Sequence, residues 1–451
     1  MDVWKSLKSK FSKSTGERVI ILGLDGAPYT LIKQFIQDGT MPNLARIVED
    51  GTLSQMDTSI PEISSVAWTT FFTGVNAARH GIYGFMDLKP NSYEMYFPNS
   101  QNVRAKALWE TLGDHGKRSV IVNVPSTYPA RPLNGILISG FVAIDLAKAT
   151  YPASLLPMLE RVNYQLDVDS AKARESLELF AESLLAVLEA REKVLWDLLV
   201  HEQWDLFVGV ITETDRMHHY LWAAIEDLRH PYHDFFKSFY TRVDRFIGKV
   251  YEWFHEKGVF MIMSDHGFCK IQKEVYLNHW LASEGYLRFS APNPQSYGDI
   301  DKVSKAFNMD PARIYIHLKG KYPYGSVSSG AEYDSLREEL KSRLLDIKVD
   351  GAPVIQRVFF KEEIFKGPFI NEAPDLLLLP NWGFDIKGTI TKSCFTGNSL
   401  LTGMHTQNDS TFFINVKHAS NERVNIMNIA PTALKATGIE VDREFDASSL
   451  I

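Results

Sequence analysis

Short apolar runs, rich in β-branched residues, recur between helical stretches and constrain the fold more than any other feature. The first, RVIILGLDGAP at 18–28, stops at Gly-Leu-Asp-Gly, and similar runs occupy 118–125, 204–215 and 259–265. Runs without alternation are typical of strands that are buried on both faces of a parallel sheet. Between them apolar residues return at helical spacing, and glycines close the helices. The sequence therefore predicts an α/β fold, with a doubly wound, mostly parallel sheet and helices on both faces.

This rhythm breaks in the last third of the chain. Residues 283–350 are rich in Pro, Gly, Ser and Tyr, yet they include a credible strand, ARIYIHL. We expect an inserted cap there rather than a linker. The α/β core would then have two parts, at 17–282 and 351–451.

Residues 1–16 form a basic leader that would be amphipathic as a helix. Val3, Trp4, Leu7 and Phe11 would share one face, and lysines would surround it. Such a helix can lie on an anionic membrane surface, so weak membrane contact is one hypothesis and a solvated leader is the other. The segment lacks the apolar centre and cleavage site of a signal peptide.

The overall composition excludes several classes of protein. The net charge is −7 and no stripe of Lys or Arg is visible, which argues against nucleic acid as the main partner. Two cysteines make no disulfide framework and fit a reducing compartment. No apolar stretch is long enough to span a membrane. We expect a cytoplasmic protein, which would be membrane-peripheral if the leader binds lipid.

Three of the predicted strands end on residues that can bind metal ions. Asp25 follows VIILGL, Asp215 follows FVGVITET, and the pair Asp265 and His266 follows VFMIMS. A single Asp at such a place is usually a cap or turn residue. However, ligands of open parallel sheets bind beyond the carboxyl ends of the strands. Three acidic ends at equivalent positions therefore indicate a site.

Two further histidines complete a candidate ligand set. In a helix that begins at Asp215, His219 lies one turn later on the same side, whereas His218 points about 100° away. His405 stands in the Gly-flanked segment GMHTQND. Three carboxylates and three imidazoles suit two divalent ions, and the mixed oxygen and nitrogen donors favour Zn²⁺, with Mn²⁺ or Fe²⁺ possible, over Mg²⁺ or Ca²⁺. Paired ions typically promote in-line displacement at phosphorus.

The segment 60–82 offers hydroxyl groups for a nucleophile. A helix should begin at Ser64 or Ser65, because Ser is a good N-cap, and end near Gly74. A hydroxyl at a helix N-terminus lies beside free N–H groups that bind phosphate, and a nearby metal ion would lower its pKa. The plain alternative is an N-cap without chemistry. Spacing alone does not choose between the two serines.

Six segments in this order resemble the alkaline phosphatase superfamily. The nearest branch is the type I phosphodiesterase/nucleotide pyrophosphatase family, in its soluble prokaryotic members. The segments are LGLDGAP, SSVAWTTFFTGVNAARHGIYGF, TETDRMHHYLW, SDHGF, GMHTQND and NIAPTALKATGI. Each is modest alone, whereas the ordered set is specific and covers the chain from residue 18 onward, apart from the cap. The resemblance implies a metal-dependent hydrolase of phosphodiester or pyrophosphate bonds that acts on small-molecule phosphoesters.

The resemblance also assigns the metal ligands. It gives one ion to Asp215, His219 and His405. It gives the other ion to Asp25, Asp265, His266 and the nucleophile. In the family the nucleophile lies ten residues before the Gly of a Thr-Gly pair, and counting back from Gly74 selects Ser64 over Ser65. Ser64 would thus attack phosphorus, form a phosphoserine and also bind metal.

Two departures from the family pattern bear on the substrate. Nucleotide pyrophosphatases commonly carry an Asn after the His-Gly-Ile segment to bind a phosphate oxygen, where this chain has Gly84 and Phe85. Four residues after the nucleophile stands Trp68, where nucleotide enzymes often have His. We therefore expect the backbone near Ser65 to supply the phosphate contact. Aromatic residues near the mouth of the site are further candidates for substrate binding: Tyr83, Phe85, Tyr128 and Trp222.

Other activities are compatible with the same core. A phosphomonoesterase, a phosphotransferase or a phosphomutase would use the same ligands, although the mutase of this superfamily carries its insertion directly after the nucleophile region. A membrane-surface binding protein without turnover is a hypothesis from another class. A sulfatase is disfavoured because the segment that follows Ser64 has neither the Pro nor the Arg of the sulfatase pattern.

Overall fold

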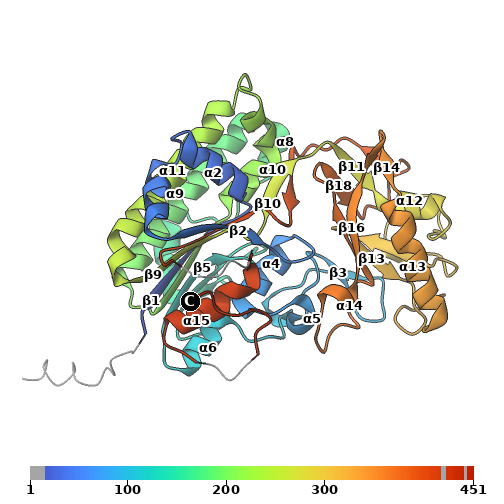
Figure 1. Cartoon of the computed structure of the whole chain (residues 1–451), viewed down its shortest axis with the longest axis horizontal. Helices are drawn as coiled ribbons and strands as arrows, with labels where there is room; N and C mark the ends of the chain where they lie inside the picture. The colour runs from blue at the N-terminus through green and yellow to red at the C-terminus, as the bar shows by residue number, and fades with distance from the viewer. Residues whose placement is uncertain (1–15, 418–422, 441–443) are drawn as a thin grey trace, which may run out of the picture.

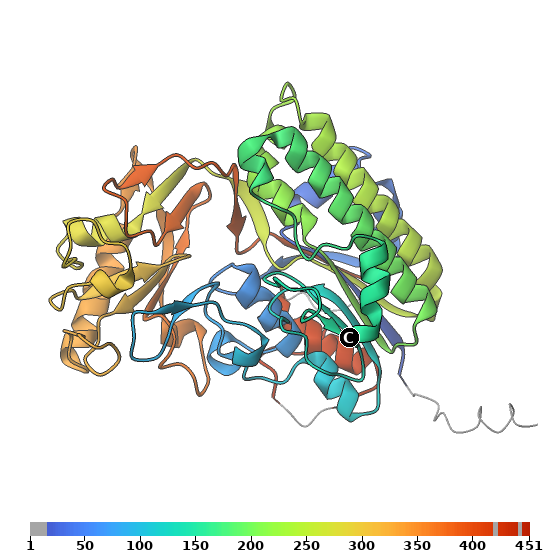
Figure 2. The ribbon, with the colours of Figure 1, turned by 180° about the vertical axis from the view of Figure 1, so that it is seen from behind.

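The computed structural model describes residues 16–417, 423–440 and 444–451. A large lobe is built on a nine-stranded sheet, and a smaller lobe lies beside it (Figures 1 and 2). Nearly all of the basic leader at 1–16 falls outside the described residues. Among the helices of the described ranges, none is both long enough and apolar enough to cross a bilayer.

The large sheet is mostly parallel, which confirms the predicted fold class. From edge to edge its strands are β22 (Val424–Asn425), β2 (Thr52–Asp57), β21 (Ser410–Ile414), β9 (Gly258–Met263), β1 (Arg18–Leu24), β8 (Leu206–Ile211), β5 (Ser119–Val124), β6 (Gly135–Ser139) and β7 (Thr150–Tyr151). The five central strands from β9 to β6 are parallel to one another. The antiparallel pairs are β2–β21, β21–β9 and β6–β7.

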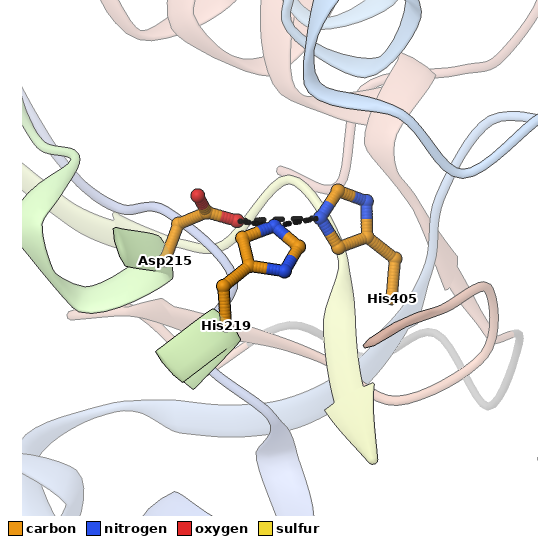
Figure 3. A group of neighbouring side chains, drawn as sticks. All are labelled: Asp215, His219 and His405. Carbon is orange, nitrogen blue, oxygen red and sulfur yellow. Dashed lines mark hydrogen bonds and ion pairs between the residues drawn. The ribbon is translucent and has the colours of Figure 1, made fainter. Parts of the chain in front are cut away.

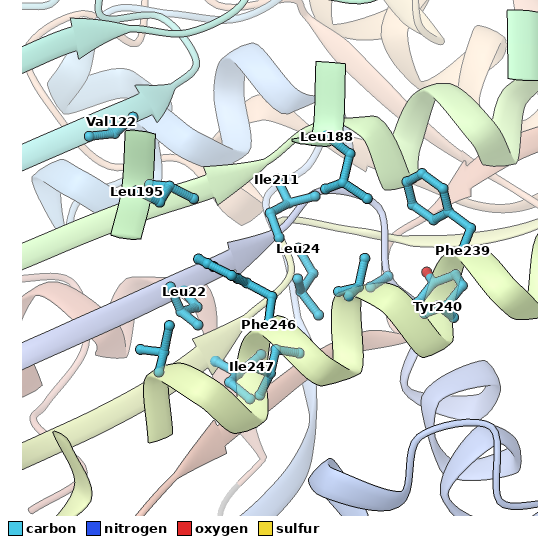
Figure 4. Close-up of a cluster of buried hydrophobic side chains, with 14 of the residues drawn as sticks. Leu22, Leu24, Val122, Leu188, Leu195, Ile211, Phe239, Tyr240, Phe246 and Ile247 are labelled. Carbon is cyan, nitrogen blue, oxygen red and sulfur yellow. The ribbon is translucent and has the colours of Figure 1, made fainter. Parts of the chain in front are cut away.

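Helices cover both faces of this sheet. Alternate residues of β1 divide between two apolar clusters, with Leu22 and Leu24 on one face and Val19 and Ile21 on the other. The first face packs against α2 (Tyr29–Gln37), α3 (Pro42–Ile47), α9 (Leu177–His201), α10 (Glu213–Glu226) and α11 (His233–Phe254). Figure 4 shows part of this layer. The second face packs against α4 (Ser64–Thr73), α6 (Leu108–Asp114) and α15 (Ile429–Ala436).

The smaller lobe has an apolar cluster of its own. Its four-stranded sheet has the order β12 (Ala306–Met309), β13 (Arg313–Ile316), β17 (Leu376–Pro380) and β16 (Ile355–Phe360). Also in the lobe are β11 (Lys273–Tyr276), β18 (Phe384–Lys387), β19 (Thr396–Gly397), α12 (Leu277–Ser283) and α13 (Ala331–Leu345). The cluster runs from Val275 to Ile386, so the unit that packs together extends beyond the 283–350 segment expected to form a cap.

The remaining elements are short. They are α5 (Ala77–His80), α7 (Leu156–Arg161), α8 (Lys172–Glu175), α14 (Lys361–Ile364), β3 (Asp87–Leu88), β4 (Met95–Tyr96), β10 (Gly267–Lys270), β14 (Lys348–Val349), β15 (Ala352–Pro353) and β20 (Gly403–Thr406). The strands β10 and β20 pair in antiparallel fashion, with Phe268 opposite His405. This pairing brings His405 to the carboxyl end of β9.

A fully buried ion pair joins α9 to the start of α10. Arg191 Nη2 lies 3.0 Å from Glu213 Oε1, and both side chains have an exposed fraction of 0%. Tyr164 also contacts the guanidinium group of Arg191. Because Glu213 precedes Asp215 by two residues, the pair fixes the first turn of the helix that carries two candidate ligands.

We expect Glu213→Ala to lower the free energy of unfolding by about 3–5 kcal/mol, because it leaves the Arg191 charge buried without its partner. Urea unfolding followed by circular dichroism measures the change. Glu189→Ala is the matched control, since Glu189 pairs with Lys193 on the exposed side of α9, the helix that carries Arg191. It should leave stability unchanged. Equal effects of the two variants would contradict the structural role of the buried pair.

Candidate metal centre

Three neighbouring strands deliver acidic residues to one edge of the sheet. Asp25 follows β1 directly, Asp215 lies in the first turn of α10 after β8, and Asp265 follows β9 by two residues. Since β1 pairs in register with both β8 and β9, the carboxyl ends of the three strands are level. All three carboxylates are buried.

One group of candidate ligands consists of Asp215, His219 and His405 (Figure 3). Asp215 Oδ1 lies 3.4 Å from His219 Nε2 and 3.3 Å from His405 Nε2. The two Nε2 atoms are 3.1 Å apart. As Figure 3 shows, the carboxylate and both imidazoles converge on one point from α10 and from β20. Helical spacing explains how Asp215 and His219 share a face.

A second group consists of Asp25, Asp265 and His266, with Ser64 beside it. His266 Nε2 lies 3.3 Å from Asp265 Oδ2, 3.6 Å from Asp25 Oδ1 and 3.1 Å from Ser64 Oγ. Ser64 Oγ lies 3.5 Å from Asp25 Oδ1. The two groups adjoin, because His266 Nε2 is only 3.9 Å from Asp215 Oδ1.

The three imidazoles are oriented in the same way. Each donates its Nδ1–H to a backbone carbonyl oxygen: His219 to Gly403 at 3.2 Å, His405 to Glu62 at 2.8 Å and His266 to Gly267 at 3.1 Å. Such a bond fixes the tautomer and turns Nε2 toward the site, as in protein metal centres generally.

His218 has a different role. Its Nδ1 donates to the carbonyl oxygen of Gly26 at 2.9 Å, and Tyr240 donates its hydroxyl to Nε2 at 2.9 Å. Burial lowers the pKa of His218 to about 3, so the ring is neutral. His218 is therefore a packed core residue, which agrees with the expectation that it points away from Asp215 and His219.

The three buried carboxylates of the site favour the binding of cations. Burial, together with the neighbouring Asp265 and Asp215, raises the pKa of Asp25 well above its ordinary value. Burial also raises the pKa of Asp265 to about 6. Burial acts in the same direction on Asp215, but the imidazoles of His219 and His405 hold its pKa well below the ordinary value. Three carboxylates crowded in a low-dielectric interior are stable together only when positive charge offsets them.

Two carboxylate oxygens provide a test of whether the residues fit metal ions. Asp215 Oδ1 and Asp265 Oδ2 are buried, and neither accepts a hydrogen bond from the part of the chain that the structure describes. Each points at the Nε2 atoms of its own group. Within each group the ligand atoms lie within 4.8 Å of one another, so both sets fit a divalent ion with oxygen and nitrogen donors.

Trp68 is a supporting residue that sequence reasoning did not identify. From the first turns of α4 its Nε1–H donates to Asp25 Oδ2 at 3.1 Å, while Thr214 donates its hydroxyl to the backbone oxygen of Asp25 at 2.6 Å. Its position four residues after Ser64 was the available signal, since residues at that spacing lie on the same side of a helix.

We expect Trp68→Phe to weaken zinc binding about 10- to 100-fold, because Asp25 loses the donor that orients it while most of the packing is retained. Competition against a chromogenic chelator measures the affinity. Trp109→Phe is the matched control, since Trp109 is buried against Phe72, elsewhere in the same layer. Equal affinities in the two variants would contradict an orienting role for Trp68.

Ser64 is the first residue of α4 rather than its N-cap. The N-cap is Ile63, which makes no side-chain capping bond. The predicted helix start at Ser64 is confirmed, and the alternative that Ser64 serves only as an N-cap is wrong. The helix ends at Gly74 in the left-handed conformation, with φ 67°, as predicted. The Ser64 hydroxyl is therefore available to the second ligand group. Ser65 Oγ is buried and has no hydrogen-bond partner among the described residues.

A cavity of about 500 Å³ opens onto the group of Asp215, His219 and His405 and onto Ser64, and it reaches the smaller lobe. Ser64, Ser65 and Phe85 line it, together with Asp215, His219 and His405. Arg216 also lines it, and this residue was not predicted. Its guanidinium is held by Asp167 at 2.8 Å and by Asp215 at 2.8 Å.

The other aromatic candidates are not among the described residues that line this cavity. Tyr83 is buried and donates its hydroxyl to the backbone oxygen of Phe369 at 2.5 Å. Trp222 is buried too, and its indole donates to Glu226 at 3.0 Å. The structure therefore does not support the expected substrate contacts of Tyr83, Trp222 and Tyr128, because none of the three lines the cavity. Aromatic rings often pack inward, as Tyr83 and Trp222 do here.

Comparison with solved structures shows the same fold in other proteins. A phosphonoacetate hydrolase from Sinorhizobium meliloti 1021, in complex with phosphonoacetate, has 18% identity and a TM-score of 0.63 over 93% of this chain and 96% of that chain. The murine ectonucleotide pyrophosphatase/phosphodiesterase 5, an inactive form with AMP, has 14% identity and a TM-score of 0.56 over 94% and 96%. The human protein has 14% identity and a TM-score of 0.57 over 96% and 97%.

Sequence comparison gives the family. No curated protein matches the chain. The sequence profile named "Type I phosphodiesterase / nucleotide pyrophosphatase", however, matches residues 19–408, which hold all the candidate ligands. The chain therefore belongs to the type I phosphodiesterase/nucleotide pyrophosphatase family of the alkaline phosphatase superfamily, and it is a metal-dependent hydrolase of phosphoester or pyrophosphate bonds.

Proposed function

We propose that the protein cleaves phosphodiester or pyrophosphate bonds of small molecules with two divalent ions and a covalent phospho-Ser64 intermediate. The position of Ser64 carries this proposal. Its Oγ lies 3.1 Å from His266 Nε2 and 3.5 Å from Asp25 Oδ1, at the N-terminus of α4. A hydroxyl between ligand atoms and free helix N–H groups is placed for attack on phosphorus.

The reaction would proceed in two displacements. Asp215, His219 and His405 would hold one ion, and Asp25, Asp265, His266 and Ser64 the other. Bound there, the ions would lower the pKa of the Ser64 hydroxyl and offset the charge that develops on the phosphoryl oxygens. Ser64 Oγ forms a bond to phosphorus while the bond to the leaving oxygen breaks. Water then cleaves the phosphoserine and releases the phosphoryl product.

Zinc is the ion that we propose, with Mn²⁺ or Fe²⁺ as alternatives, because three imidazoles accompany three carboxylates. The relatives with solved structures were captured with phosphonoacetate and with AMP, which supports a small-molecule substrate. The backbone N–H groups of the first turn of α4, near Ser65, are the proposed contacts for a phosphoryl oxygen.

The deciding experiment compares bis-p-nitrophenyl phosphate with p-nitrophenyl phosphate, each with Zn²⁺ or Mn²⁺. We expect the larger kcat/KM for the diester. A larger value for the monoester would overturn the diesterase proposal in favour of a phosphomonoesterase or a phosphomutase. Absence of turnover with both metals would favour transfer to another acceptor or binding without turnover.

Membrane contact through residues 1–16, the cytoplasmic location and the absence of a nucleic-acid partner stay predictions. Co-sedimentation with anionic liposomes, before and after deletion of residues 1–16, tests the first of them. If the leader binds lipid, the deletion should reduce sedimentation. Unchanged sedimentation would exclude it as an anchor.

A further inference from the structure

A row of aromatic side chains leads from the protein surface to the metal centre. The row consists of Phe97, Phe85 and Phe141, and we call it the aromatic track. The rings of Phe97 and Phe85 meet edge to face at 5.4 Å, and those of Phe85 and Phe141 stack at 5.4 Å with an angle of 8°. Phe97 is 55% exposed, whereas Phe85 and Phe141 line the cavity.

The inner end of the track reaches a candidate ligand. The guanidinium carbon of Arg216 lies 4.3 Å from the centre of the Phe141 ring. Arg216 Nη1 in turn donates to Asp215 Oδ2 at 2.8 Å. The track is therefore continuous with the place where the phosphoryl group would react.

The rest of the cavity wall is also largely apolar. Met86, Met95, Met309, Ile386, Ile390 and Met404 line it. Several polar groups of the wall are already engaged within the protein. Lys387 pairs with Asp385 at 2.6 Å, and Tyr297 donates its hydroxyl to the backbone oxygen of Asn308 at 2.8 Å. Arg313 pairs with Asp87 and donates to the backbone oxygen of Met86 at 2.6 Å.

From this arrangement we infer the substrate class: a phosphodiester whose non-leaving ester group is a hydrocarbon chain or an unsubstituted aryl ring that lies along the aromatic track. The inference rests on the proposed function. The rings of Phe85 and Phe141 are already stacked on each other, so no gap is left in which a nucleobase could stack between them. A nucleoside would also leave its hydrogen-bonding groups against an apolar wall, which is costly, whereas an apolar group gains from burial.

The test is a series of p-nitrophenyl phosphodiesters that differ in the second ester group: methyl, octyl, phenyl and thymidine-5′. For the wild-type enzyme we expect kcat/KM for the octyl and phenyl esters to exceed that for the methyl ester at least about tenfold, the usual effect of filling an apolar pocket. The thymidine ester should fall below both. A preference for the thymidine ester, or equal values throughout, would overturn the inference.

Phe85→Ala and Phe97→Ala test the track itself through the ratio of octyl to methyl kcat/KM. We expect each variant to lower this ratio at least about threefold through loss of apolar contact. Tyr324→Ala is the matched control, because Tyr324 is an exposed aromatic residue of the smaller lobe outside the cavity lining. It should leave the ratio unchanged. An unchanged ratio in both Phe variants would contradict the track, even if the wild-type enzyme prefers the octyl ester.

These outcomes separate the inference from the function on which it rests. If every ester is hydrolysed at the same rate, the substrate class is wrong and the diesterase stands. If no ester is hydrolysed with Zn²⁺ or Mn²⁺ while p-nitrophenyl phosphate is, the diesterase proposal fails and the inference fails with it.

Discussion

Ser64→Ala should lower kcat for a phosphodiester by about 10⁴-fold or more, which is the usual effect of removing a covalent nucleophile. The structure gives the reason, since Ser64 Oγ is the hydroxyl that contacts both His266 and Asp25. Steady-state hydrolysis of bis-p-nitrophenyl phosphate measures the loss. Rapid quenching of the wild-type enzyme with ³²P-labelled substrate should trap the label on Ser64, and the variant should trap none.

Ser65→Ala is the matched control for this prediction. Ser65 is the next residue of the same helix turn, also buried, and its Oγ has no hydrogen-bond partner in the described ranges. The variant should keep kcat within about threefold of the wild type, because its proposed contribution comes from the backbone N–H. Loss of activity in Ser65→Ala together with activity in Ser64→Ala would exchange the roles of the two serines.

The parallel core was predictable because buried strands have a simple signature. Runs such as VIILGL and VFMIMS show no alternation, and their order along the chain with intervening helices permits few topologies. The strand β2, TLSQMD, which pairs with β21 in antiparallel fashion, has no such signature. The extent of the smaller lobe was also missed, because LLLL in β17 is equally apolar whichever sheet it joins.

The acidic ligands were predictable from position, since every parallel strand delivers its carboxyl end to the same edge. The choice of Ser64 came from the family resemblance, because two adjacent serines look alike in a spacing argument. The contact between Trp68 and Asp25 joins a helix to the end of a distant strand. The spacing from Ser64 places Trp68 on the side of the helix that faces the site, but it does not reveal Asp25 as the partner. Tyr83 illustrates the opposite error, because a residue close to a motif in sequence can face the core.

Asp265→Ala should abolish both zinc binding at the second group and turnover. Asp265 is fully buried, its Oδ1 accepts the N–H of Gly26 at 3.1 Å, and its Oδ2 faces His266 Nε2 at 3.3 Å. Alanine has no side-chain oxygen to take the place of Oδ2. Zinc content by mass spectrometry of the native protein and hydrolysis of the diester measure the two effects.

Thermal unfolding gives a readout that does not depend on catalysis. An ion that binds only the folded state stabilises it by about 2.7 kcal/mol at a hundredfold excess over Kd, so zinc should raise the Tm of the wild type markedly. The increase should be much smaller in Asp265→Asn. Without metal the order should reverse: Asp265→Asn should have the higher Tm, because it relieves the repulsion with Asp25 and Asp215.

Asp244→Asn is the matched control for both variants. Asp244, in α11, is also fully buried, but it accepts hydrogen bonds from Asn43 and Leu44 of α3. It should lower the metal-free Tm and keep the full increase upon addition of zinc. The opposite changes in metal-free Tm, together with the different responses to zinc, distinguish a carboxylate that binds a cation from one that stabilises the fold. A zinc-dependent rise in Asp265→Asn equal to that of the wild type would remove Asp265 from the ligand set.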